Sequence, residues 1–279
     1  MKIMVIGAGQ MGGGIAQVMA ANNHVTYLND ISMELIHKRV DFIGAILQKN
    51  VDKGKISPDQ RMETLSRILP TISLDDAADC DLIIEAIVEN MEAKASIFSK
   101  LDLICKPSCI FASNTSSLPL TEIAACTNRP DRVIGMHFMN PVPVMKLVEI
   151  IRGLATSDET YEVIKQLAKD IAKVPVEVRD VPGFVSNRVL QLMINEAIYC
   201  LYEGVATPQG IDTVMKLGMN NPMGPLELAD FIGLDTVLAI METLYHGYGD
   251  CKYRPCPLLR QYVKAGWYGK KSGRGFYQY

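Results

Sequence analysis

Residues 2–30 read KIMVIGAGQMGGGIAQVMAANNHVTYLND, and this stretch decides how the first part of the chain folds. Its first five residues have the short apolar pattern of a buried strand, and a glycine-rich turn then leads into an apolar helix. We expect Asn22-Asn23 to end this helix, because asparagine tolerates the left-handed conformation that closes helices. A second strand, VTYLND, runs to Asp30. A strand, turn, helix and strand within about thirty residues predict one βαβ unit.

The turn has the spacing of a dinucleotide-binding fingerprint, with Gly7, Gly9 and Gly12 ahead of an acidic residue, Asp30, that closes the second strand. Glycine lets the backbone approach a pyrophosphate, and the helix N-terminus offers N–H donors to it. The carboxylate of Asp30 can accept hydrogen bonds from ribose hydroxyls but would repel the 2′-phosphate of NADP. Ile31-Ser32-Met33 offers no arginine, so NAD is favoured, although this motif leaves NADP and FAD open.

Strand and helix patterns alternate over the residues that follow. We expect helices over 33–51, 91–104, a stretch ending near 68 and a stretch after Pro119, and strands in DLIIEAI, CIFAS, RVIGMHF, KLVEII and VEVRD. This alternation predicts a parallel sheet with helices on its faces. Beyond Pro182-Gly183 only helical patterns remain, over 184–203, 208–217, 224–246 and 255–265. The predicted fold class is therefore α/β, with a Rossmann-type parallel-sheet domain over 1–182 followed by an all-helical second domain over 183–279.

Charge and cysteine content argue against several classes of protein. A formal net charge of −3 over 279 residues leaves no basic excess, so we do not expect nucleic acid as the main partner. The seven cysteines include no CxxC pair and no nearby histidine at ligand spacing, which favours reduced thiols in the cytoplasm over a metal site. Glycines at 7–14 argue against an export signal, and no stretch has the roughly 18 uninterrupted apolar residues of a membrane span.

One histidine and one glutamate lie within the apolar stretch GMHFMNPVPVMKLVEI, residues 135–150. An ionised carboxylate buried there without a partner would cost several kcal/mol. His137 falls at the carboxyl end of its predicted strand, where parallel sheets bind ligands, and Glu149 falls in a neighbouring strand. Glu149 bound to one ring nitrogen would fix the tautomer and leave the other nitrogen for proton transfer. For a histidine alone, a structural, half-buried role is the commoner alternative.

Three other polar sites have both a structural and a functional interpretation. SNTSS, residues 113–117, could cap the next helix or point a hydroxyl at a ligand. The residue pattern does not show which of Ser116 and Ser117 would face the ligand. Asn187 lies in the first turn of a helix, where its amide could form a structural hydrogen bond or face a cleft between domains. Lys49 and Lys53 could meet a polyphosphate or belong to a solvated helix face.

Seven motifs, in order, resemble the short-chain (S)-3-hydroxyacyl-CoA dehydrogenases and in particular the bacterial 3-hydroxybutyryl-CoA dehydrogenases. They are GAGQMGGGIAQ, EAIVENMEAK, ASNTSSL, IGMHFMNPVPVMKLVEI, PGFVSNRV, NPMGPLELADFIGLD and AGWYGKKSGRGFY, and they cover essentially the whole chain. The resemblance implies NAD-dependent interconversion of (S)-3-hydroxybutyryl-CoA and acetoacetyl-CoA by hydride transfer, in butyrate and fatty acid metabolism. It also implies a homodimer, or a higher oligomer, formed through the C-terminal helical domain.

The resemblance further implies roles for single residues. The family's catalytic histidine, orienting glutamate, cleft serine and second-domain asparagine fall on His137, Glu149, Ser116 and Asn187. Its cofactor contacts fall on Gly7, Gly9, Gln10, Met11, Gly12, Asp30, Glu89, Lys94, Asn114 and Asn140. Lys49 and Lys53 are similar to the residues that meet coenzyme A phosphates, and Ser116 and Asn187 also belong to the substrate side.

Two other functions stay open at this point. One is a dehydrogenase of a free 3-hydroxy acid, in which a lysine would donate the proton; the pairing of His137 with Glu149 argues against it. The other is a non-catalytic NAD-binding protein, which the complete catalytic set disfavours.

Overall fold

The computed structural model describes residues 1–279, and the chain divides into two compact units, Met1–Asp180 and Val181–Tyr279. The first unit holds eight strands in one sheet: β1 (Lys2–Ile6), β2 (Val25–Asn29), β3 (Ile68–Thr71), β4 (Leu82–Glu85), β5 (Ile110–Ser113), β6 (Val133–Phe138), β7 (Leu147–Arg152) and β8 (Val174–Arg179). Its helices are α1 (Gln10–Ala21), α2 (Met33–Asp52), α3 (Pro58–Ser66), α4 (Met91–Ile104), α5 (Leu120–Ala124) and α6 (Asp158–Asp170).

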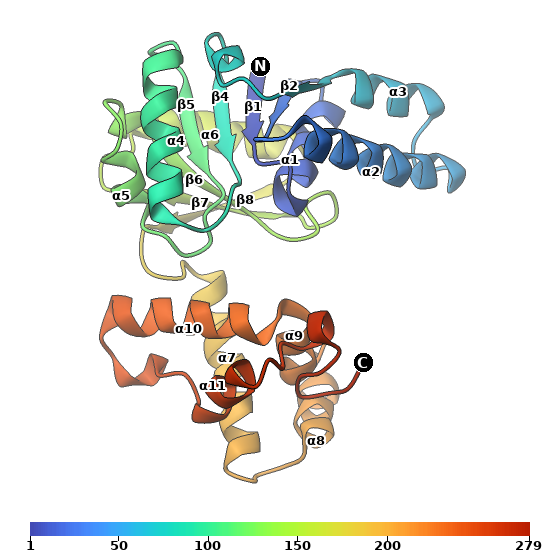
Figure 1. The fold of residues 1–279 in the computed structure, drawn as a ribbon, viewed down its shortest axis with the longest axis vertical. Helices are drawn as coiled ribbons and strands as arrows, with labels where there is room; N and C mark the ends of the chain where they lie inside the picture. Colours follow the sequence, from blue (N-terminus) through green and yellow to red (C-terminus); the bar gives the residue numbers. More distant parts are fainter. The chain divides into compact units, whose positions relative to one another are not determined.

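The strand order is β3-β2-β1-β4-β5-β6-β7-β8, and Figure 1 shows the strands side by side with the helices around them. The Rossmann-type α/β fold is thus confirmed. The expectation of a wholly parallel sheet is wrong at one pair, because β6 and β7 run antiparallel. The connection between them, residues 139–146, is too short for the crossover that parallel strands need, so the chain turns straight back.

Strand β3 was missed in the sequence, where a helix was expected to end near Ile68. Its four residues, ILPT, include Pro70, which cannot donate a hydrogen bond to a neighbouring strand. β3 pairs only with β2 and forms one edge of the sheet, where a proline is tolerated. The proline is the reason that the sequence pattern did not predict this edge strand.

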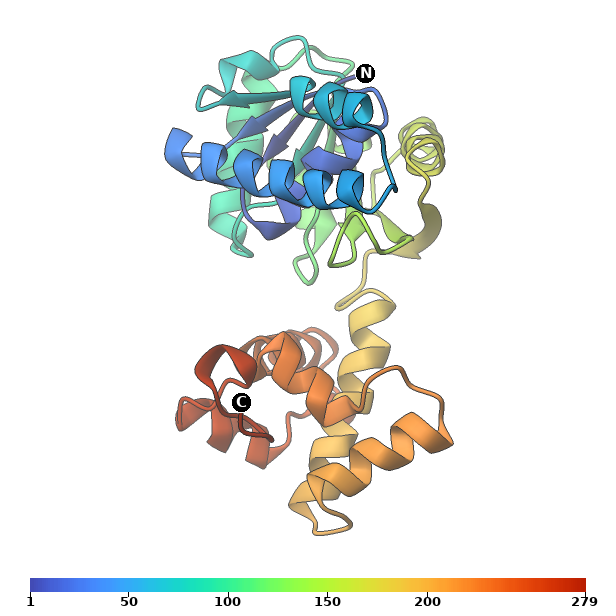
Figure 2. The same ribbon diagram turned by 90° about the vertical axis from the view of Figure 1, so that its right-hand side faces the viewer.

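Helices cover both faces of the sheet. On one face, buried residues of α1, α2 and α6, such as Ile15, Ile43 and Ile164, form a single core with Val5 of β1 and Leu28 of β2. Figure 2 shows α2 and α3, in shades of blue, lying next to each other in front of the strands. On the other face the ring of Phe98 in α4 packs 5.7 Å from that of Phe111 in β5. Because strands β1 to β6 are parallel, their carboxyl ends lie at one edge of the sheet.

The second unit consists of helices α7 (Ser186–Tyr202), α8 (Pro208–Thr213), α9 (Pro225–Ile232), α10 (Leu234–Tyr248) and α11 (Pro257–Lys264), with a π-helical turn at Val214–Gly218. This confirms the all-helical second part. One helix expected over 224–246 is two helices, because Gly233 has a φ of +103° that ends α9 before α10 begins. None of the helices has both the length and the apolar character needed to cross a membrane.

Candidate active site

His137 and Glu149 face each other across β6 and β7. They are paired in the antiparallel register, which places their side chains on the same face of the sheet. Nδ1 of His137 lies 2.8 Å from Oε2 of Glu149, and the residues are only 8% and 2% exposed. An ionised carboxylate only accepts hydrogen bonds, so Nδ1–H donates and the tautomer is fixed. The contact predicted from the sequence is confirmed, and Glu149 has the partner that its burial demands.

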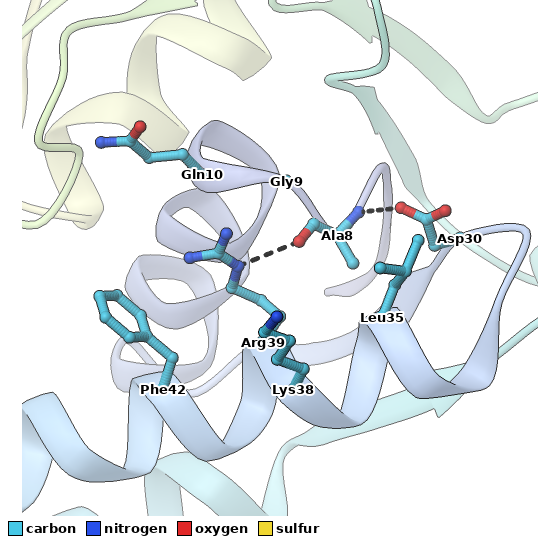
Figure 3. Close-up of a pocket in the computed structure, with 8 residues that line it drawn as sticks. All are labelled: Ala8, Gly9, Gln10, Asp30, Leu35, Lys38, Arg39 and Phe42. Atoms are coloured by element: carbon cyan, nitrogen blue, oxygen red, sulfur yellow. Dashed lines mark hydrogen bonds between the residues drawn. The ribbon is translucent and has the colours of Figure 1, made fainter. Parts of the chain in front are cut away.

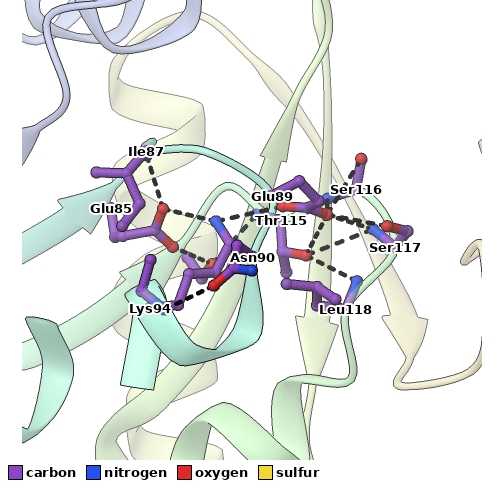
Figure 4. A network of polar contacts seen from close by, with 11 residues as sticks. Glu85, Ile87, Glu89, Asn90, Lys94, Thr115, Ser116, Ser117 and Leu118 are labelled. Carbon is purple, nitrogen blue, oxygen red and sulfur yellow. Dashed lines mark hydrogen bonds and ion pairs between the residues drawn. The ribbon is translucent and has the colours of Figure 1, made fainter. Parts of the chain in front are cut away.

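Glu89 holds the serine-containing loop that follows β5 (Figure 4). Its Oε1 accepts hydrogen bonds from the backbone N–H groups of Ser116 and Ser117, at 2.8 and 2.9 Å, and from Oγ1 of Thr115 at 2.7 Å. Burial by itself would raise the pKa of the Glu89 carboxyl. The charge of Lys94 and these hydrogen bonds outweigh burial, so the pKa of Glu89 is lowered and the residue is an anion at neutral pH.

Beneath Glu89 lies an ion pair between Lys94 and Glu85. The Nζ of Lys94 is 2.6 Å from Oε1 of Glu85 and 3.3 Å from Oε2 of Glu89, so one ammonium group joins two carboxylates. Oε2 of Glu85 accepts from Oγ of Ser113 at 2.7 Å. Glu85 was not singled out in the sequence, although it shows the same signal as Glu149: a carboxylate within an apolar strand.

One interpretation of SNTSS expected its serines to cap the helix that follows. This interpretation is wrong. The N-cap of α5 is Pro119, without a side-chain hydrogen bond, and the carboxylate of Asp180 accepts from the N–H groups of Leu120 and Thr121 at 2.9 and 2.7 Å. Asp180 lies far from α5 in the sequence, so no local pattern could reveal this cap. The serine loop is therefore fixed by Glu89 instead of by α5.

Two asparagines tie neighbouring loops to this edge of the sheet. Oδ1 of Asn114 accepts from the N–H of Phe138 at 2.9 Å, next to His137. Oδ1 of Asn140 accepts from Nε2 of Gln10 at 3.0 Å, which links the loop after β6 to the glycine-rich turn. The carboxyl-end loops of β1, β4, β5 and β6 thus support one another within the first unit.

The glycine-rich turn fits a dinucleotide. A Cβ on Gly12 would lie 1.8 Å from the carbonyl oxygen of Gly7, so only glycine allows this close packing. A Cβ on Gly9 would meet nothing within 4 Å, so the backbone there borders open space. Gly9 is also the N-cap of α1 without any side-chain cap, which leaves N–H donors of the helix for a phosphate.

Asp30 lies beside this turn in a cavity of 630 Å³ (Figure 3). Its Oδ2 accepts from the N–H of Ala8 at 2.6 Å, and its Oδ1 accepts from the N–H of Ile31 at 2.7 Å. The cavity is lined by Ala8, Gly9, Gln10, Asp30, Leu35, Lys38, Arg39 and Phe42. The last four come from α2 and were missed in the sequence, yet their spacing of three and four residues places them on one helix face.

The remaining predicted residues lie elsewhere. Lys49 is in the last turn of α2 and Lys53 is its C-cap; both are exposed, and neither forms an ion pair within the chain. Asn187 belongs to the second unit, where it lies half-buried in the first turn of α7. Met11 lies partly buried in the first turn of α1 and packs against the core.

Comparisons with known proteins show consistent similarity over the whole length. The family description "3-hydroxyacyl-CoA dehydrogenase, NAD binding domain" matches residues 2–181, and "3-hydroxyacyl-CoA dehydrogenase, C-terminal domain" matches 183–279. A "Probable 3-hydroxybutyryl-CoA dehydrogenase" of Bacillus subtilis is 62% identical over 278 residues, covering 100% of this chain and 97% of the relative. A "3-hydroxybutyryl-CoA dehydrogenase" of Clostridioides difficile is 50% identical, covering 100% and 99%. The crystal structure of an (S)-3-hydroxybutyryl-CoA dehydrogenase from Ralstonia eutropha superposes with a TM-score of 0.98 at 48% identity, covering 100% and 98%.

Proposed function

We propose, from the premise that this chain belongs to the 3-hydroxyacyl-CoA dehydrogenase family, that its substrate pair is (S)-3-hydroxybutyryl-CoA and acetoacetyl-CoA. Membership confirms the resemblance that the seven sequence motifs predicted. The chain is accordingly an NAD-dependent oxidoreductase of 3-hydroxyacyl-CoA thioesters. The short acyl group is proposed because relatives that match the chain end to end carry 3-hydroxybutyryl-CoA in their names.

The observation that carries the chemistry is the 2.8 Å contact between His137 and Glu149. We propose that His137 is the general acid and base. Because Nδ1 is engaged by Glu149, Nε2 is the nitrogen that exchanges a proton with the substrate. During oxidation His137 removes the proton of the 3-hydroxyl group, and during reduction protonated His137 returns a proton to the 3-keto oxygen. The carboxylate of Glu149 orients the ring and balances the positive charge that His137 gains.

Ser116 and Asn187 are proposed to donate hydrogen bonds to the substrate oxygen as negative charge develops on it. Such donors act best when they are held in place before the reaction. Glu89 provides this for the serine loop, since it accepts hydrogen bonds from the backbone N–H groups of both Ser116 and Ser117. The choice of Ser116 over Ser117 follows the family resemblance.

The cofactor-binding residues are assigned as a group within the first unit. When bound, NAD accepts the hydride that leaves C3 of the hydroxyacyl group or supplies it in the reverse direction. We assign its binding to Gly7, Gly9, Gln10, Met11, Gly12, Asp30, Glu89, Lys94, Asn114 and Asn140. The open backbone at Gly9 and the acceptor at Asp30 support the adenosine and phosphate end of this assignment.

We assign the phosphates of coenzyme A to the exposed, unpaired ammonium groups of Lys49 and Lys53. Residues 1–182 form the NAD-binding domain, and residues 183–279 serve substrate binding and formation of a homodimer or higher oligomer. The enzyme works in the cytoplasm, in butyrate and fatty acid metabolism.

The first test is the loss of NADH absorbance with acetoacetyl-CoA compared with free acetoacetate. We expect rapid turnover of the thioester and much slower turnover of the free acid. Equal turnover of both would favour a dehydrogenase of free 3-hydroxy acids. No turnover of either, with NADH binding demonstrated, would leave a protein that binds the dinucleotide without catalysis.

The second test is His137→Gln. General acid–base catalysis is typically worth about 10² to 10⁴ in rate, so we expect a loss of at least about 10² in kcat while NADH still binds. Retained activity in this variant would contradict the assignment of His137.

A further inference from the structure

The dinucleotide cavity beside Asp30 contains two cations, Lys38 and Arg39. In the sequence, the residues directly after Asp30 offer no arginine that could bind a 2′-phosphate. One turn and a half into α2, however, both side chains line the same cavity as the acidic residue (Figure 3). Neither forms an ion pair with a carboxylate of this chain, so their charges are not neutralised by the protein.

Arg39 is held in this position by the glycine-rich helix. Its Nε donates to the carbonyl oxygen of Ala8 at 3.0 Å, and a Cβ on Gly13 would lie 2.2 Å from its Cδ. Gly13 therefore provides the space for the arginine stem. This explains a glycine that the dinucleotide fingerprint itself does not require. With Nε directed at the protein, the terminal N–H groups of the guanidinium have no hydrogen-bond partner in the chain.

Asp30 is the only acidic residue among those that line the cavity. Both of its oxygens already accept backbone N–H groups, from Ala8 and Ile31. Its negative charge is what would repel a phosphate on the adenosine ribose. The surrounding side chains otherwise suit such a group, because a guanidinium and an ammonium are the usual protein partners of phosphate.

We propose that Lys38 and Arg39 form a ready binding site for a 2′-phosphate in this cavity, a site that the negative charge of Asp30 keeps from admitting a phosphorylated dinucleotide. The inference rests on the assignment of this cavity to the adenosine end of NAD. Cofactor choice then depends on one carboxylate that lies in the same cavity as two cations. Removing the charge of Asp30 should therefore create NADPH binding without any added positive charge.

The experiment measures binding and not turnover, by the fluorescence of NADH and NADPH titrated with protein in the absence of any thioester. In Asp30→Asn, which keeps an acceptor for the N–H of Ala8, we expect NADPH affinity to rise about tenfold or more. Adding Arg39→Met or Lys38→Met to this variant should each reverse most of the gain. Lys55→Met, which removes an exposed charge from outside the cavity, is the matched control and should not reverse it.

Two further measurements keep the proposal testable if Asp30→Asn folds poorly. Asp30→Ser removes the charge with a smaller side chain, and thermal melting reports whether each variant is folded. In the Asp30→Ser variant, adding Arg39→Met should weaken NADPH binding about tenfold more than NADH binding, and high salt should weaken NADPH binding more steeply than NADH binding.

The outcomes separate this proposal from the assignment on which it rests. If folded Asp30→Asn and Asp30→Ser gain no NADPH affinity, or if Arg39→Met added to either of them weakens the binding of both dinucleotides equally, the phosphate site is refuted while NADH binding stands. If the unaltered protein binds neither dinucleotide, the cofactor assignment of the cavity itself is wrong.

Discussion

The ammonium group of Lys94 lies 2.6 Å from the carboxylate of Glu85, and both side chains are almost completely buried, at 1% and 0% exposure. This pair lies at the carboxyl end of β4, directly beneath the residue that holds the serine loop. Buried ion pairs add little net stability when intact, but removal of one partner leaves an uncompensated charge. The free energy of unfolding should therefore change most when only one partner of the pair is removed.

Lys94→Met should destabilise the protein strongly, since it leaves Glu85 buried without its cation. We expect the free energy of unfolding to fall by about 3–5 kcal/mol, measured by urea unfolding. Lys100→Met is the matched control, because Lys100 is exposed on the same helix and should change stability by about 0.5 kcal/mol or less. A small, equal effect of both substitutions would show that Glu85 is neutral or solvated.

Glu89→Gln should impair catalysis more than NADH binding, because Glu89 fixes the loop that carries Ser116. The amide keeps one acceptor oxygen but loses the charge that attracts Lys94. We expect kcat to fall while the Kd for NADH, measured by fluorescence, rises less. If the Kd rises as much as kcat falls, Glu89 acts mainly by contacting the cofactor.

The pH dependence of the unfolding free energy should reveal the charge of Glu89. The pKa of Glu89 is lowered in the folded protein, so its ionised form contributes stability above the unfolded pKa of about 4.3, and this contribution is lost as the pH falls through the folded pKa. Glutamine mimics the protonated acid. The difference in unfolding free energy between the unaltered protein and Glu89→Gln should therefore be largest near neutral pH and shrink below about pH 4. A difference that does not change with pH would contradict the charged state of Glu89.

Glu149→Gln should remove the support of His137 without removing the histidine. An amide cannot balance an imidazolium charge, and its NH2 group can turn toward Nδ1 and favour the wrong tautomer. We expect kcat for acetoacetyl-CoA reduction to fall by about 10² or more, with NADH still bound. If kcat is retained, the pair is structural.

Lys49→Met and Lys53→Met should raise the KM for acetoacetyl-CoA and leave slow turnover of free acetoacetate unchanged, because only the thioester carries phosphates. Added salt should reduce the difference from the unaltered enzyme, as exposed charges are screened. Lys169→Met, at an exposed position of α6, provides a control for a lost surface charge. An equal rise in KM for this control would contradict the assignment of Lys49 and Lys53 to the phosphates of coenzyme A.

The sequence by itself determined the parts of this protein that depend on neighbours along the chain. The βαβ unit over residues 2–30 could be predicted because periodicity and glycine spacing are local properties, and Asn23 does adopt the expected left-handed conformation, with a φ of +67°. The contact of His137 with Glu149 was also within reach, since they lie on consecutive strands joined by a short loop. Seven motifs in order were enough to indicate the family.

Tertiary structure decided what depends on residues that are distant in the sequence. Pro70 could lie in a strand only because that strand is at a sheet edge, and α5 is capped by Asp180 from the far end of the unit. Arg39 enters the cavity beside Asp30 because Gly13, on another helix, leaves space for it. Packing and hydrogen bonds between separate elements create these features, and such contacts leave no periodic pattern in the sequence.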